Sequence, residues 1–240
     1  METKKNNKLK ILAVKGGCSK KQFPQIPEPL LQPPFTLSMI APTKSGKSTS
    51  IVNLLKNVCM GYCDNVFETI YYISPTVGFD KTLKSISDDE EIVKISDEDD
   101  LKHLDDILGE LIKSQKEKDS DDRGHILIIL DDCLDYLRAK TSKRLDSLPS
   151  FSRHYNISLI ITTQVYNALP VKLRKNVSGL TISRIYNKKD YENIEDEIGA
   201  NFHDFKSNYE IATNEPYNFL FVDNREMKLY HNFDKLLWAK

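Results

Sequence analysis

Residues 41–48, with the sequence Ala-Pro-Thr-Lys-Ser-Gly-Lys-Ser, place the strongest constraint on the fold of this chain. They follow an apolar run at residues 35–40 and lead into a stretch of helical composition at residues 47–59. Such a loop binds an anion when its backbone N–H groups and those of the first helical turn point into one space. The sequence therefore predicts a strand, a loop and a helix in this order around the motif.

Further apolar runs alternate with helix-like stretches along the chain. Strands are expected at residues 35–40, 67–74, 125–130, 157–163, 179–185 and 219–222, and helices at residues 47–59, 97–113, 140–150 and 189–198. The uninterrupted apolar run at residues 126–130 is typical of a strand that is covered on both faces. We expect an α/β fold in which helices flank a central, mainly parallel sheet.

The length and composition indicate one domain with an extension. A chain of 240 residues with 40% hydrophobic content can bury one substantial core. Residues 1–34 hold five of the ten prolines, and residues 1–21 hold seven lysines against one glutamate. We expect a basic, Pro-rich extension at residues 1–34 and a single domain at residues 35–240. The basic arm either contacts phosphates or is a solvated tail, and residues 9–14 could form an accessory strand.

Charge and cysteine content exclude several classes of protein. The net charge of −1 gives no overall basic field, so contact with nucleic acid would need local patches. Two basic stretches, at residues 170–175 and 184–189, could contact phosphates or be solvated surface; their basic residues are Lys172, Arg174, Lys175, Arg184, Lys188 and Lys189. Cys18, Cys59, Cys63 and Cys133 lack zinc-type spacing and are expected to be reduced thiols.

No apolar run approaches the roughly 20 residues of a membrane span, so we expect a soluble intracellular protein without membrane contact. Residues 113–124 are dense in charge and are expected to form a loop or a frayed helix end.

The loop motif has the chemistry of a phosphate-binding loop, the Walker A motif. Lys47 can bring a positive charge to the β- and γ-phosphates of ATP, and the Ser48 hydroxyl can bind Mg²⁺. Ala41 stands where glycine is usual, which is tolerable if its backbone keeps a negative φ. The residues expected to bind the nucleotide are Ala41, Pro42, Thr43, Lys44, Ser45, Gly46, Lys47, Ser48 and Thr49. An ordinary turn between strand and helix is the alternative.

Two aspartates follow the apolar run at residues 126–130. Strands of an α/β sheet deliver side chains at their carboxyl ends into the ligand crevice, so this is a Walker B pattern. We expect Asp131 to hold Mg²⁺ together with Ser48, and Asp132 to activate the attacking water as general base. The alternative is that both aspartates only cap the following segment.

Two further residues are candidates for the hydrolysis of ATP. Gln164 ends the apolar run at residues 157–163, where an amide can orient water and sense the γ-phosphate. Arg153 lies on the segment that enters the same strand, and an arginine from a neighbouring subunit can neutralise charge in the transition state. Both side chains could also be ordinary surface residues.

Three segments together resemble the FtsK-HerA superfamily of DNA-pumping ATPases, and most closely its viral branch, the poxvirus-type genome-packaging ATPases of the giant-virus or virophage type. They are APTKSGKS at residues 41–48, ILIILDD at residues 126–132 and SRHYNISLIITTQ at residues 152–164. Cellular members usually carry glutamate where Asp132 stands, which favours the viral branch.

The resemblance implies a P-loop NTPase fold of the ASCE type and the site roles given above. It also implies a homo-oligomeric ring that hydrolyses ATP to move double-stranded DNA, with contact to the capsid or its portal vertex. The implied location is the host cytoplasm or a viral factory, or the virion itself. A P-loop nucleotide kinase and a nucleotide-binding assembly protein without turnover are the alternatives. Gln164 and Arg153 fit attack by water in an oligomer better than either alternative, and no arginine-rich lid of a kinase is evident.

Overall fold

The computed structural model describes residues 26–56, 62, 66–76, 81–86, 92–138 and 142–240. The expected basic arm, the accessory strand at residues 9–14 and three of the four cysteines lie outside the described residues. Cys133 is a buried free thiol, and burial raises its pKa. No helix among the described residues has the length and apolar composition of a membrane span.

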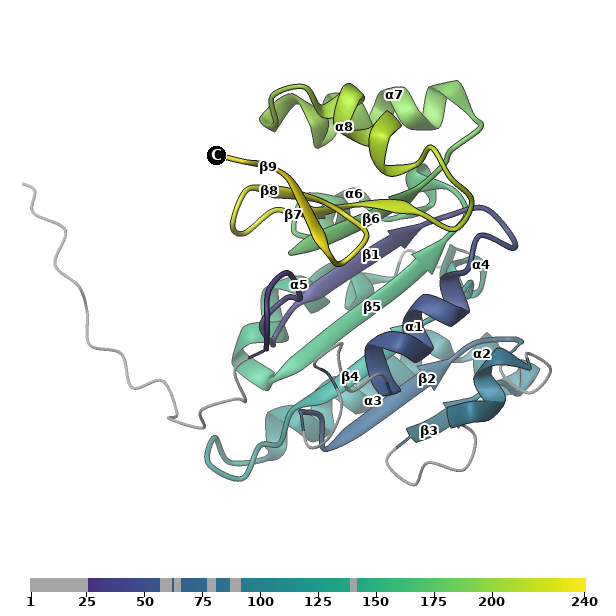
Figure 1. Cartoon of the computed structure of the whole chain (residues 1–240). Helices are drawn as coiled ribbons and strands as arrows, with labels where there is room; N and C mark the ends of the chain where they lie inside the picture. Colours follow the sequence, from purple (N-terminus) through teal and green to yellow (C-terminus); the bar gives the residue numbers. More distant parts are fainter. Residues whose placement is uncertain (1–25, 57–61, 63–65, 77–80, 87–91, 139–141) are drawn as a thin grey trace, which may run out of the picture.

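A nine-stranded sheet runs through the part of the chain that the structure describes (Figure 1). Its strands are β1 (Thr36–Ile40), β2 (Thr69–Ile73), β3 (Ile92–Ile95), β4 (Ile126–Leu130), β5 (Ile157–Thr163), β6 (Gly179–Ser183), β7 (Phe219–Asp223), β8 (Lys228–His231) and β9 (Lys235–Ala239). The strand order is β3-β2-β4-β5-β1-β6-β7-β8-β9. Strands β3 to β6 in this order pair in parallel, and β7, β8 and β9 add antiparallel pairs. The expected mainly parallel sheet is confirmed.

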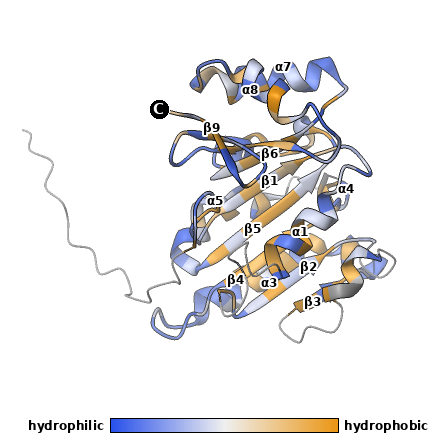
Figure 2. Ribbon diagram, in the orientation of Figure 1, coloured by the Kyte–Doolittle hydropathy of each residue, from blue (hydrophilic) through white to orange (hydrophobic). Residues whose placement is uncertain are grey.

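Helices cover both faces of this sheet. They are α1 (Lys47–Lys56), α2 (Glu98–Lys102), α3 (Leu104–Glu117), α4 (Leu134–Arg138), α5 (Lys143–Tyr155), α6 (Val171–Arg174), α7 (Lys188–Glu197) and α8 (Phe205–Ala212), with short 3-10 turns η1 (Thr82–Ile86), η2 (Tyr166–Ala168) and η3 (Gly199–Asn201). Figure 1 shows α1 in front of the sheet, α3 and α5 behind it, and α7 and α8 beside its antiparallel end. Figure 2 shows the hydrophobic residues concentrated along the central strands.

The side chains of β4 show how one strand serves two cores. Ile126, Ile128 and Leu130 belong to the core under α3 and α5. Leu127 and Ile129 belong to the core under α1. Because successive side chains of a strand point to opposite faces, a strand between two helical layers must be apolar at every position. This explains the uninterrupted run in the sequence.

Most expected elements are present, and several of them have shifted ends. The strand expected at residues 157–163 is β5 itself, but the helix expected at residues 97–113 is divided at His103 into α2 and α3. The loop expected from residue 113 begins only after Glu117. Arg123 orders this region, because its guanidinium donates hydrogen bonds to the carbonyls of Gln115, Lys118 and His154 at 2.6–2.7 Å. The antiparallel hairpin of β8 and β9 and helix α8 were not expected.

The end of the proline-rich segment lies against the sheet. Ile26, Leu30 and Leu31 are buried in the core under α1. The Tyr62 hydroxyl donates a hydrogen bond to the Leu31 carbonyl at 2.6 Å. Arg225 donates to the carbonyls of Gln32 and Pro34. These residues are therefore part of the packed structure.

The packing of Leu31 leads to a prediction of stability. Leu31→Ala should lower the free energy of unfolding by about 2–5 kcal/mol, because a buried leucine leaves a cavity. Leu236 is 50% exposed, so Leu236→Ala should lower the free energy of unfolding by less than half as much. Urea titrations of both variants measure the difference. If both variants lose the same unfolding free energy, the packing of Leu31 contributes no more to stability than that of an exposed leucine.

Candidate active site

The phosphate-binding loop connects β1 to α1 as expected, and two of its residues have left-handed backbone. Lys44 has φ 63° and Gly46 has φ 91°. Only Gly46 combines this backbone with a residue type that adopts it without strain. The N–H of Ala41 donates to the Thr163 carbonyl at 3.0 Å. Its backbone does not have a positive φ. The alanine at the first motif position is therefore accommodated.

The ammonium group of Lys47 contacts the first residues of the loop. Its side chain is 8% exposed, and its Nζ donates to the Ala41 carbonyl at 2.9 Å and to the Pro42 carbonyl at 3.5 Å. The same Nζ is 3.3 Å from Oδ2 of Asp132. A buried ammonium group with these oxygen partners is held where an anion in the loop would meet it.

Asp131 is buried at the end of β4 and is held on both carboxylate oxygens. Tyr72 of β2 donates to Oδ2 at 2.8 Å, and Thr162 of β5 donates to Oδ1 at 2.6 Å. Burial raises the pKa of the Asp131 carboxyl above its ordinary value, and these two hydrogen bonds offset the effect only in part. The strands on both sides of β4 thus fix the orientation of this carboxylate.

Asp132 turns in another direction. Its backbone has φ 51°, its N–H donates to the Thr162 hydroxyl at 3.0 Å, and its side chain is 34% exposed. It lines a hollow of about 560 Å³ whose other lining residues are Pro42, Thr43, Lys44, Ser45, Gly46, Lys47, Ser48, Thr49, Thr76, Thr82 and Tyr217. The two adjacent aspartates therefore have different environments, one buried and one open to the loop.

The residues expected to hold Mg²⁺ fit its chemistry. The described residues contain no cluster of three or more His, Cys, Asp or Glu side chains that could enclose a metal ion. Mg²⁺ usually takes one or two protein ligands and completes its shell with water and phosphate oxygens. The hydroxyl of the partly exposed Ser48 and the carboxylate of Asp131 are oxygen ligands of the type that Mg²⁺ takes.

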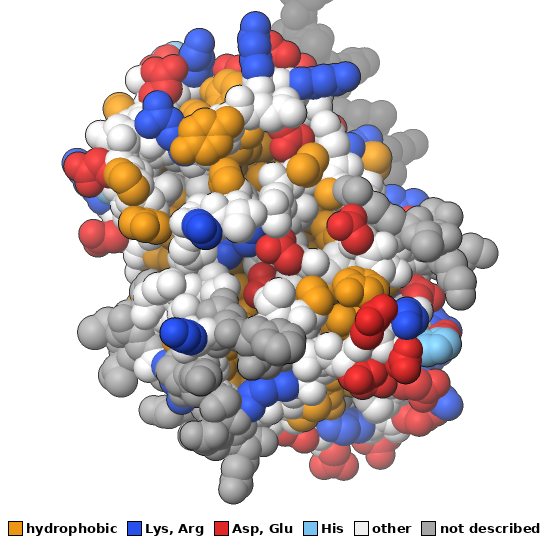
Figure 3. All heavy atoms as spheres, turned by 90° about the vertical axis from the view of Figure 1, so that its right-hand side faces the viewer, with side chains coloured by type: hydrophobic (Ala, Val, Ile, Leu, Met, Phe, Trp, Pro, Cys, Tyr) orange, Lys and Arg blue, Asp and Glu red, His pale blue; other side chains and the backbone are white. Residues whose placement is uncertain are grey.

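Gln164 lies next to the phosphate-binding loop. Its Oε1 accepts a hydrogen bond from the Thr43 hydroxyl at 3.0 Å, and the side chain is exposed at the carboxyl end of β5. Figure 3 views the molecule from the side towards which the central strands point in Figure 1. Near the middle of that face, basic and acidic side chains lie close together.

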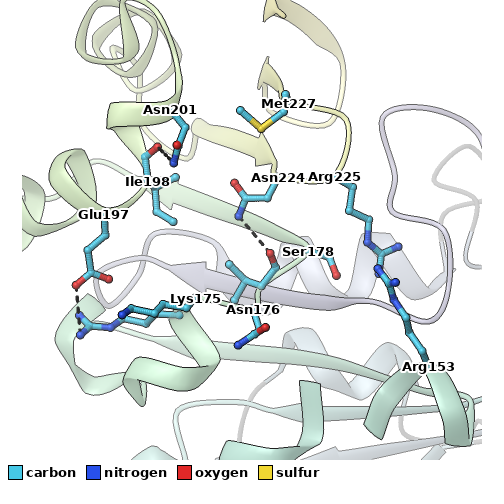
Figure 4. A pocket seen from close by; sticks show the side chains of 12 residues that line it. Arg153, Lys175, Asn176, Ser178, Glu197, Ile198, Asn201, Asn224, Arg225 and Met227 are labelled. Atoms are coloured by element: carbon cyan, nitrogen blue, oxygen red, sulfur yellow. Dashed lines mark hydrogen bonds and ion pairs between the residues drawn. The ribbon is translucent and has the colours of Figure 1, made fainter. Parts of the chain in front are cut away.

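Arg153 lies at the opposite edge of the sheet from the loop of its own chain. It is in the last turn of α5, before β5 begins, and the seven residues of β5 span about 20 Å. Figure 4 shows its guanidinium close to that of Arg225, from the turn between β7 and β8. Burial and the charge of Arg153 lower the pKa of Arg225. Within the described residues Arg153 forms no ion pair with a carboxylate, so it is an exposed cation away from its own loop.

One of the candidate basic residues has a structural role. Arg174 is 9% exposed, its guanidinium lies 3.4 Å from Glu197 and 2.7 Å from the Asn167 side-chain oxygen, and it covers the Tyr166 ring. It is therefore not available to bind a phosphate. The remaining candidates are exposed, namely Lys172, Lys175, Arg184, Lys188 and Lys189.

Several residues at or near these sites were not predicted from the sequence, among them Thr76 and Thr82 of the hollow. Tyr72 and Thr162 hold Asp131, Tyr217 lines the hollow, and Arg225 accompanies Arg153. The threonine pair at the end of an apolar strand was a signal for Thr162, but only the strand order shows that β5 lies beside β4. Tyr217 and Arg225 lie on turns, where neither periodicity nor a motif marks a residue.

The burial of Asp131 predicts how stability depends on pH. The pKa of this carboxyl is higher in the folded protein than in the unfolded chain, so its contribution to stability is lost as pH rises through the folded pKa. Asp131→Asn removes this ionisation. The free energy of unfolding of the variant relative to wild type should therefore rise as the pH increases above the ordinary pKa of an aspartic acid, about 3.9. Urea titrations without nucleotide measure it, and a difference that stays constant or falls would contradict the assignment.

Solved structures with the same fold include viral enzymes. B204, the DNA-packaging ATPase from Sulfolobus turreted icosahedral virus, is 17% identical with a TM-score of 0.62, over 88% of this chain and 100% of that chain. The genome packaging NTPase B204 from Sulfolobus turreted icosahedral virus 2, in complex with ATP-gammaS, is 18% identical with a TM-score of 0.60, over 86% of this chain and 100% of that chain. ATPases 2 and 3 of EssC from Geobacillus thermodenitrificans are 13% identical with a TM-score of 0.56, over 80% of this chain and 38% of that chain.

At these low identities the TM-scores establish a shared fold, that of P-loop NTPases, as the sequence motifs predicted. A search of curated proteins finds no match. The family described as Poxvirus A32 protein matches residues 21–203, which include all the motif segments and most of the sheet. The resemblance to the poxvirus-type ATPases is confirmed, and the chain belongs to the poxvirus A32 protein family.

Proposed function

We propose that this chain is an ATPase that packages a viral double-stranded DNA genome into a capsid. The observation that carries the proposal is the meeting of Lys47 and Asp132 in the hollow of the phosphate-binding loop, 3.3 Å apart, beside the buried Asp131. Membership of the A32 family and the fold shared with the viral DNA-packaging ATPase B204 support it. The kinase and the assembly protein lack comparable support.

The geometry of the loop supports the binding of ATP together with Mg²⁺. The N–H groups at the start of α1 and the ammonium of Lys47 would bind the β- and γ-phosphates. The nucleotide-binding set is the one expected from residues 41–49. Ser48 and Asp131 would hold Mg²⁺, which supplies charge neutralisation on the phosphate oxygens. B204 has been crystallised with ATP-gammaS and AMP, which supports nucleotide binding by this fold.

Hydrolysis would use Asp132 and Gln164. An arriving γ-phosphate competes with the Asp132 carboxylate for Lys47, because both are anions within reach of the same Nζ. Asp132 is then released to accept a proton from the attacking water. Gln164, already beside Thr43 of the loop, can orient that water.

A ring of identical subunits would bring Arg153 to the site of a neighbour. The length of β5 separates this arginine from the loop of its own chain, which supports action at the site of a neighbouring subunit. Arg225 adds a second positive charge beside it. Such a pair attracts the phosphates of a neighbouring nucleotide.

Double-stranded DNA is the proposed cargo, and the capsid or its portal vertex is the proposed docking partner. The exposed basic residues after β5 can track phosphates without reading bases. Packaging in the host cytoplasm or a viral factory fits this role.

An ATPase assay with and without double-stranded DNA tests the proposal. Wild-type protein should hydrolyse ATP, and DNA should stimulate it. Lys47→Ala should abolish turnover, a loss of at least about 100-fold, because the loop loses its cation. Lys113→Ala, at an exposed lysine on α3 outside the hollow and the proposed DNA contacts, serves as the control and should keep wild-type turnover. A folded Lys47→Ala variant with wild-type turnover would refute the proposed site.

Mixing two inactive variants tests the shared site. Arg153→Ala subunits should bind ATP normally but hydrolyse it slowly, and Asp132→Asn subunits should bind ATP without hydrolysing it. In mixed oligomers some interfaces join an intact Asp132 to an intact Arg153, so turnover should partly return. Native mass spectrometry verifies mixing. Mixed oligomers that remain inactive would exclude action of Arg153 in trans.

A further inference from the structure

A second hollow, of about 240 Å³, borders the phosphate-binding loop on the side of β6 and β7. It shares Pro42, Thr43, Lys44 and Ser45 with the larger hollow, and its other side is formed where β6 ends and β7 begins. Arg184 and Tyr186 contribute from the segment after β6, and Glu215 and Tyr217 from the turn before β7. A ligand that occupies the larger hollow at the loop can therefore extend directly into the smaller one.

Tyr217 borders both hollows and lies against the loop. A Cβ atom at Gly46 would be 3.5 Å from Cδ1 of the Tyr217 ring. The residue is nevertheless 72% exposed. Its ring thus covers the edge of the loop while keeping much of its surface open to a ligand.

The backbone of this tyrosine is strained, and its turn is held in place. Tyr217 has φ 67°, a conformation that costs a residue other than glycine about 1 kcal/mol. Asn232, between β8 and β9, accepts from the Phe219 N–H at 3.0 Å and donates to the Asn218 side-chain oxygen at 3.1 Å. The antiparallel hairpin thereby positions the turn that presents Tyr217 beside the loop.

The lining of the smaller hollow has the chemistry of a base-binding site. Tyr186 is 83% exposed, so two aromatic rings are open to solvent at this hollow. Figure 3 shows large hydrophobic side chains exposed on this face. Aromatic rings stack on the flat faces of nucleobases, and a guanidinium and a carboxylate can meet the polar edge of a base. Arg184 and Glu215 provide these two groups.

We propose that the smaller hollow binds the base of the nucleoside triphosphate and that Tyr217 stacks on that base. The inference rests on the proposed function, since it uses the phosphate site of the same nucleotide. The phosphates occupy the larger hollow at the loop, and the base lies beyond Tyr217 on the side of β6. Stacking acts on the base, so Tyr217 contributes affinity for the nucleoside and not for the triphosphate group. Because every base has a flat face, this contribution does not depend on which base is bound.

Binding of two ligands separates the base from the phosphates. Mg·ATP and inorganic tripolyphosphate with Mg²⁺ are titrated calorimetrically into wild type, Tyr217→Ala and Tyr217→Phe. Tyr217→Ala should weaken ATP binding about ten-fold and leave tripolyphosphate binding unchanged. Tyr217→Phe keeps the ring and should bind ATP within about two-fold of wild type. Phe151→Ala removes a partly exposed ring at the other edge of the sheet and should change neither affinity.

Each other result overturns the inference. If Tyr217→Ala weakens both ligands equally, Tyr217 supports the phosphate-binding loop and does not bind the base. If it weakens neither, or if wild type binds tripolyphosphate as tightly as ATP, no base site exists here. Wild-type protein that binds neither ligand would refute the proposed function as well, whereas wild-type protein that binds ATP keeps the two questions apart.

Discussion

The carboxylate of Asp131 is the point on which the geometry of the site depends. Its oxygens accept hydrogen bonds from Tyr72 on β2 and Thr162 on β5, so three neighbouring strands are joined at their carboxyl ends. Ionising a buried carboxylate is costly, and these hydroxyls reduce the cost without removing it. The position of the next residue follows, because Thr162 also accepts the N–H of Asp132. That contact directs the second carboxylate into the hollow, towards Lys47.

The two edges of the sheet carry different parts of the proposed reaction. The loop, both aspartates and Gln164 lie at the carboxyl ends of the parallel strands, while Arg153 and Arg225 lie at the other edge. A subunit with this arrangement offers a nucleotide site on one edge and cations on the other. Stacked head to tail in a ring, each subunit would complete the site of its neighbour. The central strands run between these two ends, and their side chains are buried in the cores on both faces of the sheet. Because both cores are closely packed, the strands form a rigid connection between the loop and the two arginines.

The sequence predicts the part of the site that local patterns encode. The loop and the Walker B run were identified because a motif and an apolar strand mark them, and Gln164 because it ends such a strand. Tyr72 and Thr162 reach Asp131 only because β2 and β5 lie on either side of β4. The sequence of a single strand does not reveal which strands are its neighbours. The hairpin of β8 and β9 was missed because its strands are short and partly exposed, so alternation is weak. Arg174 was misassigned because its sequence neighbours give no sign of the burial that Glu197 and Tyr166 impose.

The first position of the loop motif shows which part of the motif the backbone requires. Ala41 continues the pairing of β1 with β5 through its N–H, and its carbonyl accepts the Lys47 ammonium. Both functions use backbone atoms in a conformation open to any residue, so a methyl group there has no conformational cost. Gly46, with φ 91°, has the opposite requirement, since a side chain would be strained whatever space surrounds it. The glycine that this loop needs is therefore the one beside Lys47, and alanine at the start of the motif is compatible with a complete phosphate-binding loop.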